Sequence, residues 1–535
     1  MAQMFSWWQT GVIYQVYPRS FMDGNGDGIG DLVGIRQRLD YLRWLGIDTL
    51  WLSPIYPSPM ADFGYDISDY TAIEPLFGSL DDFDGLLRDV HQRKMKLVLD
   101  FVPNHTSDEH RWFQEARASR ESAKRDWYIW HNPAPDGGPP NNWTSFFGGS
   151  AWQLDAESGQ YYLHMFDVKQ PDLNWRNPQV RQAMYDVLRF WLERGVDGFR
   201  VDVIWMMIKD DLFRDNFERP EWRPGDAPYA RQDGLYTENQ PEVHQVIREM
   251  RTVFDEYDER VFVGEIYLPL PKLMEYYGHA LDEVHLPFNF RFLELDGWNA
   301  QLLRQSVDEY EAALPDNAWP NWVLGNHDRP RIASRIGREQ ARIAQMLLLT
   351  LRGTPTCYYG DELGLQDTTI PANLMQDPQG KSNPLHSRDP QRSPMPWHPG
   401  PNAGFSAPDT NVPLWLPLPD DYHSSNVASE LTDPHSFLML VKNLLTLRRT
   451  HPALTRGSYR PLDQVPTACF VYLRQHEQSS YLIALNCSDS AQTITCPQFG
   501  SAHVLLSTYL DRADAADLSS FHLRAHEGCI LEIEV

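Results

Sequence analysis

The sequence predicts an α/β fold: a (β/α)8 barrel with a subdomain inserted after its third strand and an all-β domain at its C-terminus. Eight short apolar runs, several of them separated by amphipathic helical patterns, match the strand count of such a barrel. One connection is far longer than a single crossover helix requires, which indicates the insertion. Beyond residue 455, short β-runs at hairpin spacing replace the helical patterns and indicate the separate β domain.

The eight runs have strand character and are almost continuously apolar. Parallel strands that are buried on both faces have this composition. A doubly wound sheet is the alternative, but no Gly-x-Gly-x-x-Gly follows the first run, so we favour the barrel. The runs span residues 11–18, 49–54, 96–103, 198–204, 261–267, 283–290, 319–327 and 353–360.

Helical patterns precede the second, third and fourth runs, at 34–46, 80–95 and 178–195. In the last of these, apolar residues recur at steps of three and four, which is typical of an amphipathic helix. The expected domains are the barrel at 1–103 and 176–455, the inserted subdomain at 104–175, and a C-terminal β-sandwich at 456–535.

Composition excludes several classes of protein. The 535 residues carry a formal net charge of −26, so a basic nucleic-acid footprint is absent. Five cysteines without Cys-x-x-Cys spacing disfavour a disulfide framework or a zinc site. The first residues lack a basic stretch followed by an apolar one, and no run of about 18 apolar residues exists. We therefore expect a cytoplasmic protein without a membrane span. A monomer or homodimer is expected, although none of these observations fixes the oligomeric state.

Ionisable residues end four of the predicted strands. Burying one carboxylate without a partner is costly, and a lone acid at a strand end is often a turn former or a helix cap. Four such ends on the C-terminal face of one barrel instead favour a shared polar pocket. The motifs are "DFVPNH" (100–105), "GFRVDVIW" (198–205), "GEIY" (264–267) and "GNHD" (325–328).

These four motifs, in this order, resemble those of the α-amylase family of glycoside hydrolases, family 13. "QPDLNW" (170–175) resembles the additional motif of its oligo-1,6-glucosidase/α-glucosidase branch. The resemblance covers nearly the whole chain and implies a TIM barrel. It also implies a nucleophile at Asp202, a general acid/base at Glu265 and a transition-state stabiliser at Asp328. Arg200 lies two residues before Asp202, so both point to one strand face, where the guanidinium would keep Asp202 ionised.

The resemblance also implies substrate-binding residues. His105 and His327 would donate hydrogen bonds to sugar hydroxyls. In "DFGYDISDY" (62–70), Asp62 would grip the non-reducing terminal glucose and Tyr65 would stack on its ring. Relatives pair that Asp with the Arg of an "RTPMQW" motif; here "RSPMPW" provides Arg392. Such a pair would close one end of the pocket and favour release of single glucose units.

The residue after the proposed nucleophile is Val203. In this branch the resemblance links valine there to α-1,6 activity, and threonine or alanine to a preference for α-1,4 bonds. The exchange of one methyl for a hydroxyl contributes only a modest difference in binding energy. Residues 209–245 depart from a single-helix crossover, and we expect them to border the aglycone side of the pocket.

The stretch "DGNGDGIGD" (23–31) has the alternating oxygen ligands of a calcium loop, but Gly34 stands where an EF-hand needs a glutamate, and a strand rather than a helix precedes it. The family resemblance implies a structural Ca²⁺ site there, with Mg²⁺ as the alternative. Its ligands would be Asp23, Asn25, Asp27, the Ile29 carbonyl and Asp31.

The resemblance therefore implies a retaining exo-acting α-glucosidase that releases glucose from short α-1,4 and/or α-1,6 glucosides. The alternative is a transglucosylase or isomerase of the same family, acting on sucrose, maltose or trehalose. A catalytically inactive partner of a membrane transporter is disfavoured, because the three carboxylates are present and no membrane span is.

Overall fold

Eight parallel strands form the centre of the computed structural model, which describes residues 5–408 and 412–533. The hydrogen-bonded order is β10-β11-β1-β2-β3-β7-β8-β9, so β9 and β10 lie at the ends of an almost closed barrel. Each predicted run contributes one strand, which confirms the predicted fold class. The strands are β1 (Ile13–Val16), β2 (Thr49–Leu52), β3 (Lys96–Phe101), β7 (Gly198–Val201), β8 (Val261–Gly264), β9 (Leu286–Pro287), β10 (Asn321–Val323) and β11 (Thr354–Tyr358).

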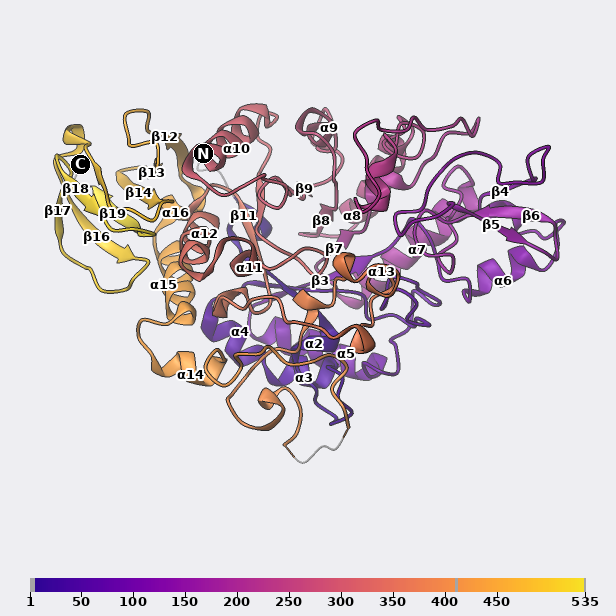
Figure 1. The fold of residues 1–535 in the computed structure, drawn as a ribbon, viewed down its shortest axis with the longest axis horizontal. Coiled ribbons are helices and arrows are strands. Elements are labelled where there is room, and N and C mark those ends of the chain that lie inside the picture. Colours follow the sequence, from indigo (N-terminus) through magenta and orange to yellow (C-terminus); the bar gives the residue numbers. More distant parts are fainter. Residues whose placement is uncertain (1–4, 409–411, 534–535) are drawn as a thin grey trace.

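Helices surround these strands (Figure 1). The longest, α7, illustrates how the sequence sets their limits. The Asn177 side chain accepts a hydrogen bond from the Gln179 amide, Pro178 begins the helix, and Gly195 ends it with φ 106°. The main helices of the ring are α3 (Leu32–Gln37), α4 (Leu39–Leu45), α5 (Leu80–Gln92), α7 (Pro178–Arg194), α8 (Val243–Asp255), α10 (Ala300–Ala313) and α12 (Arg338–Thr350).

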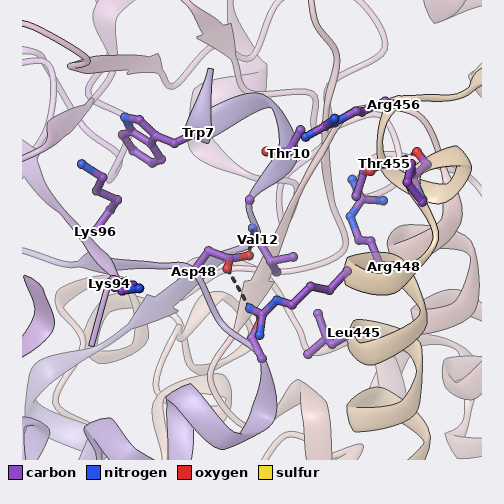
Figure 2. A pocket seen from close by; sticks show the side chains of 14 residues that line it. Trp7, Thr10, Val12, Asp48, Lys94, Lys96, Leu445, Arg448, Thr455 and Arg456 are labelled. Carbon is purple, nitrogen blue, oxygen red and sulfur yellow. Dashed lines mark hydrogen bonds and ion pairs between the residues drawn. The ribbon is translucent and has the colours of Figure 1, made fainter. Parts of the chain in front are cut away.

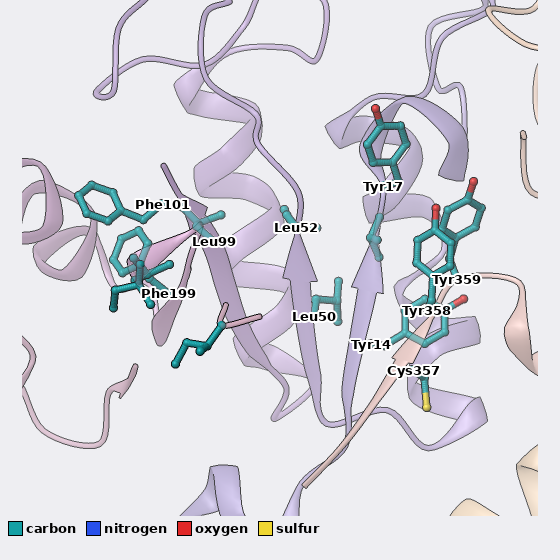
Figure 3. Packing of buried hydrophobic residues seen from close by; sticks show 14 of the residues in the cluster. Tyr14, Tyr17, Leu50, Leu52, Leu99, Phe101, Phe199, Cys357, Tyr358 and Tyr359 are labelled. Carbon is teal, nitrogen blue, oxygen red and sulfur yellow. The ribbon is translucent and has the colours of Figure 1, made fainter. Parts of the chain in front are cut away.

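Successive residues of β1, β2 and β3 face two different cores. Tyr14, Leu50 and Leu99 belong to a large cluster that also contains the buried residues of the helices (Figure 3). The alternate residues, such as Trp51 and Val98, form a second cluster inside the barrel. Because side chains alternate along a strand, the polar residues Gln15, Asp100, Arg200 and Glu265 share the inward parity of the second cluster. The barrel interior is therefore apolar at one end and ionisable at the other.

A three-stranded antiparallel sheet lies within the predicted insertion. Its order is β4 (Trp130–His131), β6 (Gln160–Leu163) and β5 (Trp152–Asp155), with α6 (Arg111–Arg117) beside it. Figure 1 shows this sheet at the opposite side of the barrel from the C-terminal strands.

The C-terminal residues form an antiparallel sheet, as predicted. Helices α15 (Phe437–Thr450) and α16 (Pro452–Arg456) connect the barrel to it. Its order is β12 (Ser458–Pro461), β13 (Cys469–His476), β14 (Ser479–Asn486), β19 (Gly528–Ile533), β16 (Ser501–Ser507) and β17 (Ala515–Asp517), and β15 (Gln492–Ile494) pairs separately with β18 (Phe521–Leu523).

All five cysteines are free thiols. Over residues 5–408 and 412–533, no helix is both long enough and apolar enough to span a bilayer.

Candidate active site

One buried guanidinium joins three strand ends. Arg200, 1 % exposed, donates from Nη1 to Asp100 at 2.7 Å and to Asp202 at 2.8 Å, and its Nη2 lies 2.7 Å from Glu265. These residues come from β3, β7 and the ends of β7 and β8, all with inward parity. The structure therefore brings Asp202 and Glu265 together, as the motifs predict, and Arg200 lies between them.

Asp100 was not among the predicted site residues, although it begins one of the motifs. It is buried at 1 % exposure and accepts hydrogen bonds from Trp51 at 3.2 Å and from the Tyr65 hydroxyl at 3.1 Å. An acid one residue before the C-terminal end of an apolar parallel strand was the available signal. Asp100 shares Arg200 Nη1 with Asp202 and so helps to hold the guanidinium in place.

The turn after β7 is strained. Val203 has φ 36° and ψ 43°, a left-handed conformation that is costly for a β-branched residue. In this conformation its backbone amide donates to Glu265 at 3.0 Å. The strain therefore coincides with a hydrogen bond that orients the Glu265 carboxylate beside Asp202.

Burial and like charge give this cluster a high affinity for protons. Burial raises the pKa of Asp202 well above its usual range; Arg200 opposes this, while Glu265 and Asp100 add to it. Burial likewise raises the pKa of Asp100 to about 6, against the charge of Arg200. Carboxyls that interact this closely titrate as a group. The cluster can therefore hold a proton near neutral pH, as an acid catalyst beside an ionised partner requires.

A second ion-pair network corrects one prediction. Asp62 pairs with Arg388, Oδ1 to Nη2 2.5 Å, and not directly with Arg392. Arg392 instead donates to Asp328 at 2.8 Å and to the His327 carbonyl at 2.8 Å. The predicted partner of Asp62, Arg392, lies four residues beyond the observed partner, Arg388. The 3₁₀ helix η7 (Pro390–Arg392) separates the two, because Arg388 precedes it and Arg392 ends it.

Asp377 fixes Arg388 in this network. It is fully buried and accepts from the Arg388 backbone amide at 2.8 Å, from Nε at 3.0 Å and from Nη2 at 2.6 Å. Arg388 also reaches Asp328 at 3.4 Å. Neither Asp377 nor Arg388 carried a distinctive sequence signal; a basic residue four positions before the "RSPMPW" motif was the only hint.

The acids of this network differ in proton affinity. Burial raises the pKa of Asp62 to about 6, although Arg388 opposes the shift. Burial acts in the same direction on Asp328, but His327, Arg388 and Arg392 outweigh it and keep its pKa below the usual range. Asp328 is therefore ionised at every working pH.

Both predicted histidines are buried and neutral. Burial lowers the pKa of His105 to about 4 and that of His327 to about 3. The Gln15 amide nitrogen lies 2.8 Å from His327 Nδ1, and this assignment leaves the proton on Nε2, which lies 3.2 Å from Asp328. Tyr65 stacks on the His327 ring, with centroids 5.3 Å apart and planes at 4°.

These residues line one cavity of about 610 Å³. Its walls include Asp62, Tyr65, His105, Asp202, Val203, Glu265, His327, Asp328 and Arg388. Residues of the 209–245 segment line it too, among them Arg219, Tyr229 and Glu238, in agreement with the expectation that this segment borders the pocket. Arg200 and Arg392 lie behind the lining.

Backbone amides of the predicted metal loop and of the adjacent Gly34 donate hydrogen bonds to carboxylates of the loop. Asp23 accepts from the amides of Asn25, Gly26 and Gly28, and Asp31 from those of Gly24, Asn25 and Gly34. The donor set is all oxygen, which suits Ca²⁺. Among the described residues, however, no three His, Cys, Asp or Glu side chains form a metal-ligand group. The cation stays a prediction.

The barrel, with paired carboxylates at its C-terminal face, defines a glycoside hydrolase of the (β/α)8 class. A model of the alpha-amylase catalytic domain matches residues 15–457. This chain belongs to the alpha-amylase family.

The chain is similar over most of its length to named glucosidases and to a solved glucosyl transfer enzyme. The chain is 41 % identical to a probable alpha-glucosidase of Rhizobium meliloti, over 92 % of this chain and 91 % of that protein. It is 37 % identical to the oligo-1,6-glucosidase of Parageobacillus thermoglucosidasius, over 99 % of both. The crystal structure of the alpha-glucosyl transfer enzyme XgtA superposes with a TM-score of 0.92 at 40 % identity, over 99 % of this chain and 100 % of that one.

Proposed function

We propose that this protein is a retaining, exo-acting α-glucosidase that releases glucose from the non-reducing end of short α-1,4 and/or α-1,6 glucosides. The observation that carries the proposal is Arg200, which contacts both Asp202 and Glu265. Two carboxylates on one guanidinium are close neighbours, and retaining glycosidases keep their pair about 5 Å apart. Inverting enzymes need a wider gap that accommodates a water molecule.

In the proposed mechanism Asp202 attacks the anomeric carbon while Glu265 protonates the leaving oxygen. The resulting glucosyl-enzyme is then hydrolysed by a water that Glu265 deprotonates. Arg200 orients Asp202 through its 2.8 Å contact, and its charge opposes the rise in the pKa of Asp202 that burial causes. Asp328 and the neutral His327 present an acceptor and a donor to sugar hydroxyls.

Exo-action is supported by the Asp62–Arg388 pair. Both residues are buried, at 4 % and 9 % exposure, and both line the cavity. Hydrogen bonds from Arg388 Nε and Nη2 to Asp377 hold the Arg388 side chain in this position. A longer glucan chain would have to displace this network, so we infer that the cavity accommodates one terminal glucose on that side.

A transglucosylase or isomerase acting on sucrose, maltose or trehalose is the alternative. The similarity to an alpha-glucosyl transfer enzyme favours it, and the same carboxylates would serve. The two functions differ only in whether water or a sugar hydroxyl attacks the intermediate.

The test is a timed product assay on maltose, isomaltose, trehalose, sucrose, maltotriose and soluble starch. We expect α-glucose as the first product from small glucosides, and a loss of about 100-fold or more in Glu265→Gln. Glu294→Gln is the matched control, because Glu294 lines the same cavity outside the Arg200 cluster. Internal cleavage of starch would contradict exo-action, β-glucose as first product would contradict retention, and new disaccharides would support the alternative.

A further inference from the structure

A second cavity lies at the opposite end of the barrel (Figure 2). Its volume is about 350 Å³. Val12 and Asp48 directly precede β1 and β2, and Lys96 begins β3, so these residues mark the amino-terminal ends of the strands. Arg448 and Arg449 of α15, residues of α16, and Trp7 and Thr10 of α1 (Trp7–Thr10) complete the wall. The catalytic groups are at the other strand ends, so this cavity is separate from the proposed active site.

The lining is strongly basic in a strongly acidic protein. Five cationic side chains face one carboxylate, Asp48, although the chain as a whole carries −26. The five are Lys94, Lys96, Arg448, Arg449 and Arg456. A concentration of one sign of charge in a hollow raises the local concentration of the opposite ion.

Internal ion pairs neutralise only part of this charge. Asp48 accepts from Arg449 at 2.8 Å and from the Val12 amide at 3.0 Å, so its charge is already engaged. Lys96 pairs with Asp197 at 3.0 Å. Over the described residues, neither Lys94 nor Arg456 has a carboxylate within ion-pair distance.

Arg448 adds a fixed charge at the back of the cavity. It is 2 % exposed and donates only to backbone carbonyls, those of Leu349, Leu351, Gly353 and Leu454. Burial lowers its pKa to about 10, so it remains charged at neutral pH. Carbonyl dipoles accept hydrogen bonds from its Nη1 and Nη2 without cancelling its charge.

We propose that this cavity binds the phosphate group of a small phosphorylated molecule. Guanidinium and ammonium groups line several walls of the cavity (Figure 2). Both kinds of group bind phosphate, since arginine offers paired donors and lysine a point charge. Thr10 and Thr455 line the same space, and the Trp7 ring offers an apolar surface beside Lys96, whose ammonium lies 5.4 Å from it. The volume of about 350 Å³ suits a small molecule.

The test measures binding of inorganic phosphate, glucose 1-phosphate and glucose 6-phosphate to the full chain, by calorimetry and by the shift in melting temperature. Sodium chloride at equal ionic strength is the reference for general salt effects. The test variant combines Lys94→Asn with Arg456→Gln. Lys94 has φ 58°, which asparagine tolerates, and both side chains are exposed, so the fold is retained. The control variant combines Arg88→Gln with Arg111→Gln, which removes the same charge from exposed positions outside the cavity.

We expect saturable binding that stabilises the protein, a loss of about tenfold or more in affinity in the test variant, and unchanged binding in the control variant. Equal binding of all three compounds would show that the cavity recognises the phosphate group alone, whereas binding of the esters alone would identify a phosphorylated sugar as the ligand. Either result supports the site. No saturable binding, a response equal to that of sodium chloride, or equal weakening in both variants would overturn the proposal.

Discussion

Replacement of Asp377 by asparagine tests whether the buried network around Arg388 determines recognition of a terminal sugar. Asp377 Oδ1 accepts from Nε and Nη2 of Arg388, and Oδ2 accepts from its backbone amide. In Asp377→Asn one carboxylate oxygen becomes an NH₂ group, so either the backbone amide or the guanidinium faces a donor. Arg388 then loses at least one charge-assisted hydrogen bond, worth about 1.5–3 kcal/mol.

That loss corresponds to about 10- to 150-fold in kcat/KM. We expect most of it in KM, because the proposed role of Asp62 and Arg388 is to bind the terminal glucose and not to act on the cleaved bond. A pH effect should accompany it. The charge of Asp377 contributes to the raised pKa of Asp62, so its removal lowers that pKa. Asp62 is ionised above its pKa, and the acidic limb of kcat/KM that reports its ionisation should move to lower pH.

The assay is steady-state hydrolysis of maltose and isomaltose between about pH 4 and 8. Asp361→Asn is the matched control: Asp361 is a buried acid paired with Arg331 at 3.3 Å, outside the cavity lining. We expect it to lower stability and leave KM and the pH limb unchanged. If Asp377→Asn has the KM and acidic limb of the unmodified enzyme, the positioning role of Asp377 is refuted.

Three further predictions concern strain, pH and metal. Val203→Gly relieves a left-handed conformation that costs about 1–2 kcal/mol. The control is Val201→Gly, which replaces a buried valine of β7. In urea unfolding, the loss of unfolding free energy in Val203→Gly should be smaller than that in Val201→Gly by about 1–2 kcal/mol, and equal losses would contradict the strain. Burial lowers the pKa of His110 to about 3, so as the pH falls below 6.5 the unfolded chain binds a proton at this residue before the folded chain does. This difference should cost about 2 kcal/mol of unfolding free energy between pH 7 and 5, and His110→Asn should remove that part of the pH dependence. Parallel plots of unfolding free energy against pH for the variant and the unmodified protein would contradict this prediction. If Ca²⁺ binds the 23–31 loop, EDTA should lower the melting temperature and Asp27→Asn should abolish the effect; an EDTA-insensitive melting curve would exclude a stabilising metal.

The strand positions could be predicted because a buried parallel strand is apolar on both faces, so each run stood out from its surroundings. Strand lengths could not. The 283–290 and 319–327 runs yield β9 of two residues and β10 of three. Pro287 lies in β9 and Pro320 directly precedes β10, and proline cannot donate to the ladder. β9 and β10 are also the two end strands of the sheet order, and they are not hydrogen-bonded to each other.

Residues of the site were predictable where a motif ends a strand, because the barrel then fixes both position and parity. Asp202, Glu265 and Arg200 are such residues. The partner of Asp62 was not, because a loop more than 300 positions away supplies it and two arginines four residues apart compete for the role. Only the path of the 376–392 segment decides that Arg388 reaches Asp62 and Arg392 reaches Asp328.

The two ion-pair networks together place six carboxyl groups around three guanidiniums: Asp100, Asp202 and Glu265 around Arg200, and Asp62, Asp328 and Asp377 around Arg388 and Arg392. The site is therefore an attractive location for a small cation, above all one that also carries hydroxyl groups. An amine buffer with several hydroxyls should compete with the sugar, and more strongly as rising pH ionises the carboxyls while the amine keeps its proton. Kinetic constants measured in such a buffer would understate the affinity of this enzyme for its substrates.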